Sequence, residues 1–95
     1  MKESEIEKYF IWKVACMGGK TYKFKSVNCR GVSDRVAMLP DGSTWFVELK
    51  TKTGKLSKLQ EIFMNTCCEL NQKYAVFHST EEINKWGYTY GKAVV

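Results

Sequence analysis

The chain has 95 residues and a mass of 11.0 kDa, enough for one hydrophobic core, so we expect a single domain over residues 1–95. An apolar content of 44% excludes a disordered chain, and no apolar run approaches the ~18 residues of a membrane helix. The net charge of +5 suits a polyanion such as nucleic acid, although many small proteins are equally basic. The N-terminal segment is charged where a signal peptide would be apolar, so we expect a cytoplasmic protein.

The four cysteines do not have the spacing of a zinc site or a disulfide framework. They are Cys16, Cys29, Cys67 and Cys68, and no C-x-x-C pair occurs among them. We therefore expect reduced cysteines, as in a cytosolic protein.

The first part of the chain predicts a helix followed by a strand. Apolar residues recur at helical spacing over residues 4–17, with Ser4 as a candidate cap. Residues 21–26 alternate, and the alternation predicts a half-buried strand with Tyr22 and Phe24 on its buried face.

A hairpin is predicted in the middle of the chain, after a loop at residues 28–33. Its strands are residues 34–39 and 44–50, and the connecting Pro40-Asp41-Gly42-Ser43 carries strong turn signals.

The last third predicts a helix, a buried strand and a second helix, at residues 57–71, 74–78 and 81–86. The complete order is α-β-β-β-α-β-α. It predicts an α/β fold in which helices flank a central mixed sheet.

The hairpin brings two carboxylates and a lysine together. Glu48 and Lys50 share one face of their predicted strand, and pairing about a four-residue turn sets Asp34 near Leu49, beside both of them. Adjacent carboxylates raise each other's pKa unless a cation lies between them. Mg²⁺ prefers a few carboxylates, several waters and phosphate oxygens, so this pattern indicates a site for hydrolysing a phosphodiester.

Asp34 followed by Glu48-Leu49-Lys50 resembles the signature of the PD-(D/E)XK nuclease superfamily, and more narrowly its VRR-NUC branch in the stand-alone, virus-type form. The similar segments keep the family's order: Ile6-Glu7, Gly18-Gly19, Lys23-Phe24, Gly31-Val32-Ser33-Asp34-Arg35, Pro40-Asp41-Gly42, Phe46-Val47-Glu48-Leu49-Lys50 and Gly54-Lys55-Leu56-Ser57-Lys58-Leu59-Gln60. Ser33 departs from the family, which usually has proline at this position, and the difference concerns the rigidity of the loop.

The resemblance implies a restriction-endonuclease-like fold and an endodeoxyribonuclease that depends on Mg²⁺ or Mn²⁺. Asp34, Glu48 and the Leu49 carbonyl would then bind the metal, and Lys50 would be the catalytic lysine.

Two further active-site residues implied by the resemblance have structural alternatives. Glu7 would be the acid contributed by the first helix, but Ser4-x-x-Glu7 is also a capping box, and Glu3 competes for the role. Gln60 would be an active-site partner on the following helix, but Ser57-x-x-Gln60 is another capping box.

Basic residues flank the carboxylates and favour phosphate contacts, the alternative being an ordinary solvated surface. The candidate DNA-binding residues are Lys23, Lys25, Arg30, Arg35, Lys52, Lys55 and Lys58. We expect His78 to be structural or solvated, and Trp12, Trp45 and Trp86 to lie in the core or an interface.

The expected substrate is DNA, in particular branched DNA such as a four-way junction, and we expect no membrane partner and no small-molecule cofactor. Two symmetric cuts would need a homodimer, for which Trp86, Tyr88 and Tyr90 offer apolar surface unless they cover the protein's own core. The alternatives are a non-catalytic DNA-binding module with the same fold and a subunit that cuts only within a larger assembly. A viral member would work in the host cytoplasm.

Overall fold

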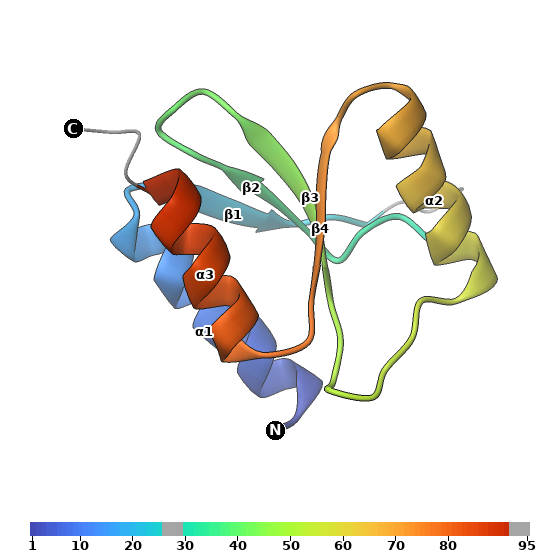
Figure 1. The fold of residues 1–95 in the computed structure, drawn as a ribbon, viewed down its shortest axis with the longest axis horizontal. Coiled ribbons are helices and arrows are strands. Elements are labelled where there is room, and N and C mark those ends of the chain that lie inside the picture. Colours follow the sequence, from blue (N-terminus) through green and yellow to red (C-terminus); the bar gives the residue numbers. More distant parts are fainter. Residues whose placement is uncertain (26–29, 92–95) are drawn as a thin grey trace.

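A computed structural model of the chain describes residues 1–25 and 30–91 (Figure 1). Its elements are α1 (Glu3–Cys16), β1 (Lys20–Lys23), β2 (Arg35–Met38), β3 (Thr44–Leu49), α2 (Lys58–Glu69), β4 (Lys73–Phe77) and α3 (Thr80–Gly91). This order confirms the predicted α-β-β-β-α-β-α arrangement. Ser26, at the end of the predicted strand, and Asn28 and Cys29, at the start of the predicted loop, lie outside the described residues. Within the described part of the chain, no helix is long and apolar enough to cross a membrane.

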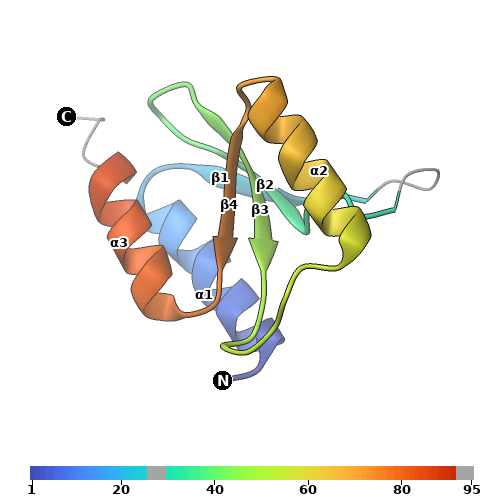
Figure 2. The ribbon, with the colours of Figure 1, turned by 45° about the vertical axis from the view of Figure 1, so that its right-hand side comes forward.

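The four strands form one mixed sheet in the order β1-β2-β3-β4. The pairs β1–β2 and β2–β3 are antiparallel, and β4 pairs in parallel with β3 after a crossover through α2. Helices α1 and α3 cover one face of the sheet and α2 covers the other (Figures 1 and 2). The antiparallel hairpin and the parallel crossover therefore bring the end of β3, the start of β2 and the end of β4 to one edge.

The main core lies between the sheet and the layer formed by α1 and α3. Trp45, Val47 and Leu49 alternate along β3 and are all buried, which confirms the predicted apolar face of this strand. They meet the buried face of α1 and, from α3 and β4, the rings of Trp86 and Phe77.

The turn between β2 and β3 is one residue shorter than predicted. Leu39 N–H donates to the Ser43 carbonyl at 2.9 Å, and Gly42 N–H donates to the Leu39 carbonyl at 3.0 Å. Three residues, 40–42, therefore form the loop, and Gly42 takes a φ of +90° that glycine adopts at little cost.

The shorter turn shifts the pairing by one position. Arg35 pairs with Val47, so continuing this register places Asp34 opposite Glu48. The predicted pairing of Asp34 with Leu49 was wrong, because it assumed a four-residue loop. The correction moves the two carboxylates closer together.

The first helix begins earlier than predicted, and its cap differs. Lys2 is the N-cap, and its backbone N–H donates to the Glu5 carboxylate at 2.8 Å, so the prediction that Ser4 caps the helix was wrong. In α2 the predicted cap is confirmed, since Ser57 Oγ accepts from Gln60 N–H at 3.2 Å.

The last helix continues beyond the predicted residue 86 as far as Gly91. Gly87 does not end it, and it lies against the Lys13 side chain of α1. A Cβ atom at Gly87 would lie 2.8 Å from Cε of Lys13. Trp86 and Tyr90 then extend the packed face of α3 over the ring of Trp45.

The prediction for the first strand was only partly correct. Phe24 packs against Phe46 and Phe63, but the Tyr22 side chain is 49% exposed. The strand β1 is at the edge of the sheet opposite β4. Because α2 leads into β4 and lies near that strand, it leaves Tyr22 on β1 uncovered.

Candidate functional site

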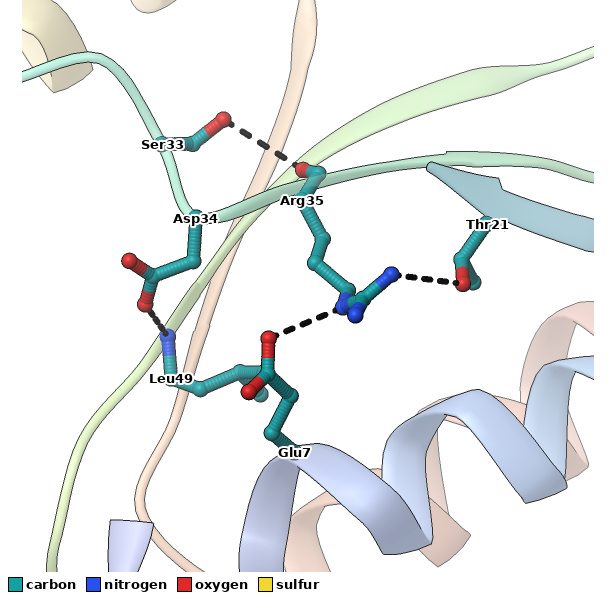
Figure 3. Close-up of polar contacts among 6 residues, drawn as sticks. All are labelled: Glu7, Thr21, Ser33, Asp34, Arg35 and Leu49. Atoms are coloured by element: carbon teal, nitrogen blue, oxygen red, sulfur yellow. Dashed lines mark hydrogen bonds and ion pairs between the residues drawn. The ribbon is translucent and has the colours of Figure 1, made fainter. Parts of the chain in front are cut away.

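Two carboxylates meet where β2 begins and β3 ends. Asp34 directly precedes β2, and Glu48 is the second-last residue of β3. Asp34 Oδ2 accepts a hydrogen bond from the backbone N–H of Leu49 at 3.0 Å (Figure 3). This bond fixes the Asp34 side chain at the end of β3, beside Glu48.

Glu48 is buried to an unusual degree for a carboxylate. It is 1% exposed, and its Oε1 atom has no hydrogen-bond partner among the residues that the structure describes. Burial raises the pKa of Glu48 to about 9, and the adjacent Asp34 side chain adds to the increase. The charge of Lys50 partly offsets the rise in this pKa. A buried, unsatisfied oxygen of this kind is costly unless a cation binds it.

The carboxylate pair fits a hard divalent cation. No group of three or more His, Cys, Asp or Glu side chains could hold a metal ion in the described ranges 1–25 and 30–91. Mg²⁺ does not need such a cage, because it keeps several waters and binds through one or two carboxylates and substrate phosphates. Asp34, Glu48 and the Leu49 carbonyl therefore provide a donor set of the right chemistry.

Lys50 is held at the same edge by its backbone. It is half-buried, and its N–H donates to the Phe77 carbonyl of β4 at 2.9 Å, one position beyond the end of β3. Its positive charge opposes the rise in the pKa of Glu48 that burial causes.

The two candidate acids of α1 lie in different surroundings. Glu7 forms an ion pair with Arg35, with 2.9 Å between Oε2 and Nε, and Arg35 Nη1 also donates to Thr21 Oγ1 at 3.3 Å (Figure 3). The capping-box alternative for Glu7 was therefore wrong. Glu3 instead adds to the increase in the pKa of Glu48. The pairing of Glu7 with Arg35 was missed because it joins residues 28 positions apart.

Gln60 adopts the capping box that the sequence offered as its alternative. Its Oε1 accepts from Ser57 N–H at 2.8 Å, and its own N–H donates to Ser57 Oγ. The side chain is thus engaged at the start of α2.

Tyr74 was missed as a neighbour of the carboxylates. The β3–β4 register pairs it with Phe46, two positions before Glu48 on the same face of the sheet. Its buried hydroxyl has no partner among the described residues, and burial followed by the nearby Glu48 raises its pKa. The available signal was the single hydroxyl group in the predicted strand at residues 74–78.

The candidate DNA-binding residues approach the same edge from several elements. The exposed ones are Lys23, Lys25, Arg30, Lys52, Lys55 and Lys58. Lys23 ends β1 and Lys25 follows it, Arg30 precedes β2, Lys52 and Lys55 lie between β3 and α2, and Lys58 is the first residue of α2. Arg35 differs because its guanidinium is already bound to Glu7.

The structure and sequence both resemble known proteins. One solved structure, a "VRR_NUC domain", superposes with a TM-score of 0.87 at 25% identity, covering 93% of this chain and 96% of the other. Residues 14–81 match the family model of the VRR-NUC domain. A curated relative, "Putative nuclease p44" of Acyrthosiphon pisum secondary endosymbiont phage 1, is 42% identical over 60 residues. That match covers 63% of this chain and 64% of the relative.

Fold and site together define an α/β domain with a carboxylate pair and a lysine at one edge of a mixed sheet. The chain belongs to the VRR-NUC family of nuclease domains.

Proposed function

We propose that the protein is an endodeoxyribonuclease that hydrolyses phosphodiester bonds with Mg²⁺ or Mn²⁺. The observation that carries the proposal is the buried Glu48 carboxylate, which lies beside Asp34 and Lys50 and whose Oε1 has no hydrogen-bond partner in the part of the chain that the structure describes. Family membership supports the nuclease function.

In this proposal Asp34, Glu48 and the Leu49 carbonyl hold the metal. When bound, the ion supplies Lewis-acid activation and neutralises charge on the phosphate. The Leu49 N–H keeps Asp34 in place, so little side-chain freedom is lost on binding. Lys50 orients the attacking water and stabilises the negative charge that develops on the phosphate oxygens.

Other residues act around this centre. Glu3 and Glu7 are both candidates for the acid supplied by α1: Glu3 acts electrostatically on Glu48, and Glu7 is connected to the site through Arg35. Gln60 contacts substrate at the start of α2, while its cap fixes the position of the helix.

DNA lies along the end of the sheet that carries the carboxylate pair and the six exposed basic residues, which we call the basic edge. The six exposed basic residues contact phosphates there, and their charge offsets the repulsion between the carboxylates and DNA. Arg35 contributes by holding Glu7 beside the start of β2, directly next to Asp34.

We further propose that the protein cuts branched DNA as a homodimer. Trp86 and Tyr90 pack on the protein's own core, so they do not supply the contact expected from the sequence. Tyr88 is 68% exposed on α3 and Trp12 is 57% exposed on α1, and these two side chains offer aromatic surface for a symmetric contact.

Cleavage assays test the proposal. Purified protein is incubated with linear, flapped and four-way DNA in Mg²⁺, Mn²⁺ or EDTA. We expect cleavage with either metal and none in EDTA, fastest on the branched substrates. Binding to DNA in Ca²⁺ with no cleavage in any metal would instead identify a non-catalytic DNA-binding module.

A further inference from the structure

His78 lies next to Lys50 across the β3–β4 pair. The parallel register pairs Leu49 with Phe77, and the bond from Lys50 N–H to the Phe77 carbonyl continues this pairing. His78 therefore lies one position beyond the end of β4, level with Lys50, which lies one position beyond the end of β3, and the continued register puts both on the same face.

The imidazole of His78 reaches a loop that is distant in sequence. Its Nε2 lies 3.1 Å from the Gly54 carbonyl oxygen, 24 positions away in the chain. A carbonyl oxygen only accepts hydrogen bonds, so Nε2 carries the proton and donates it. The His78 backbone N–H donates to Glu82 Oε1, which anchors the residue to α3. The histidine thus connects the β4–α3 junction to the loop that follows Lys50.

Gly54 in turn bounds the Lys50 side chain. Its N–H donates to the Thr51 carbonyl at 3.0 Å, which closes a tight turn directly after Lys50. A Cβ atom at Gly54 would lie only 3.3 Å from Cβ of Lys50 and 3.1 Å from Oγ1 of Thr51. Where Gly54 lies therefore determines the space available to the base of the Lys50 side chain.

We propose that His78 is a positioning residue for Lys50. Its Nε2–H holds the Gly54 carbonyl, and Gly54 holds the lysine stem in the direction of the carboxylate pair. This inference rests on the proposed function, in which Lys50 acts in catalysis. The proposal requires that residue 78 carry a hydrogen-bond donor at the position of Nε2, because this donor holds the loop that follows Lys50 in place.

Two substitutions separate the donor from the ring. In His78→Gln the side-chain amide nitrogen can reach the place of Nε2, whereas in His78→Asn it reaches only as far as Nδ1. We expect His78→Asn to lower kcat by roughly 10-fold or more, since small displacements of a reacting group are costly. We expect His78→Gln to retain most of the activity. DNA affinity in Ca²⁺ should change less than kcat, because phosphate contacts do not require exact orientation of lysine.

Gly54→Ala tests the same connection without changing the histidine. The added methyl group should press on Lys50 and lower kcat, and the loss should be smaller when His78→Asn is already present, as coupled residues are not additive. Asn65→Ala, on the exposed surface of α2, is the matched control. Equal activity of His78→Asn and the wild type would overturn the inference, as would equal losses in the Gln and Asn variants.

Amide hydrogen exchange provides a readout that does not need activity. Without metal or DNA, His78→Asn should speed exchange in the 51–56 loop, and His78→Gln should not. Unchanged exchange in a protein whose wild type cleaves DNA would overturn only the role of His78. A wild type that cleaves no DNA in either metal would overturn the proposed function itself.

Discussion

Glu7 of α1 and Arg35, the first residue of β2, form a partly buried ion pair with 2.9 Å between Oε2 and Nε. Because Asp34 directly precedes Arg35, this pair joins the first helix to the strand that carries a proposed metal ligand. Glu7 can therefore contribute to the site by fixing β2, without contacting the metal.

Removing this pair separates a structural role of Glu7 from a catalytic one. Glu7→Gln should destabilise the protein by about 1–2 kcal/mol, since the Arg35 side chain is only 16% exposed and would lose its anion. Urea denaturation measures the loss. If Glu7 only positions β2, Glu7→Gln and Arg35→Met should lower the cleavage activity by similar factors. A much larger loss of activity in Glu7→Gln than in Arg35→Met would instead place Glu7 among the catalytic groups.

The carboxylate pair gives a second prediction. Asp34→Asn and Glu48→Gln should each reduce cleavage by roughly 100-fold or more, because each removes a charged metal ligand at nearly constant volume. Glu48→Gln should also keep or raise the thermal midpoint of the metal-free protein, since it removes a carboxylate that is costly to ionise where it is buried. Glu69→Gln, an exposed change on α2, is the control. Full activity of either site variant on branched DNA would contradict the metal site.

The raised pKa of Glu48 predicts how stability depends on pH. Its pKa is 4.5 in an ordinary environment and about 9 in the folded protein. Between these values the folded state binds more protons than the unfolded state, so the contribution of Glu48 to stability falls as pH rises. This contribution is complete below pH 4.5 and is lost by about pH 9.

A bound divalent cation should reverse this trend, because it favours the ionised carboxylate. The increase in thermal midpoint caused by Mg²⁺ should therefore grow with pH over the same range. In Glu48→Gln the increase should be small and nearly independent of pH. A stabilisation by Mg²⁺ that is constant with pH in the wild type would place the ion elsewhere.

The sequence predicted the elements well because their signals are local. The alternation of Trp45, Val47 and Leu49 set the buried face of β3, and it placed Glu48 on the opposite face. The depth at which Glu48 is buried could not be read from alternation, because it depends on Tyr74 and α2, which pack over that face from later in the chain.

Errors arose where several local patterns competed or where partners were distant. Ser57-x-x-Gln60 forms its capping box, whereas Ser4-x-x-Glu7 does not, because Lys2 and Glu5 cap the helix first. The register of Asp34 changed with a single residue in the turn.

The basic edge predicts a strong salt dependence of DNA binding. Replacing Lys52, Lys55 and Lys58 together by alanine should reduce the slope of log K against log salt by up to about three, as each lost phosphate contact releases about one counterion fewer. Binding is measured in Ca²⁺ by fluorescence anisotropy across a salt series. The control replaces three exposed lysines on other elements, Lys8, Lys73 and Lys85, and should leave the slope nearly unchanged. Equal effects of the two triple variants would mean that DNA does not follow this edge.

The last prediction concerns the proposed homodimer and the face that forms it. Light scattering at micromolar concentration should give about twice the 11.0 kDa of one chain. Because Trp86 and Tyr90 pack on the core, substituting them would disturb folding, whereas Trp12 and Tyr88 are exposed on α1 and α3.

Trp12→Ser with Tyr88→Ser should therefore give a folded monomer, since the change removes apolar contact area without opening the core. Leu70→Ser, an equally exposed apolar position at the end of α2, should remain dimeric. We expect the monomer to nick a four-way junction in one strand where the dimer cuts two. A wild-type protein that stays monomeric when bound to the junction would contradict the dimer, and a dimer unaffected by the double substitution would place the contact on another face.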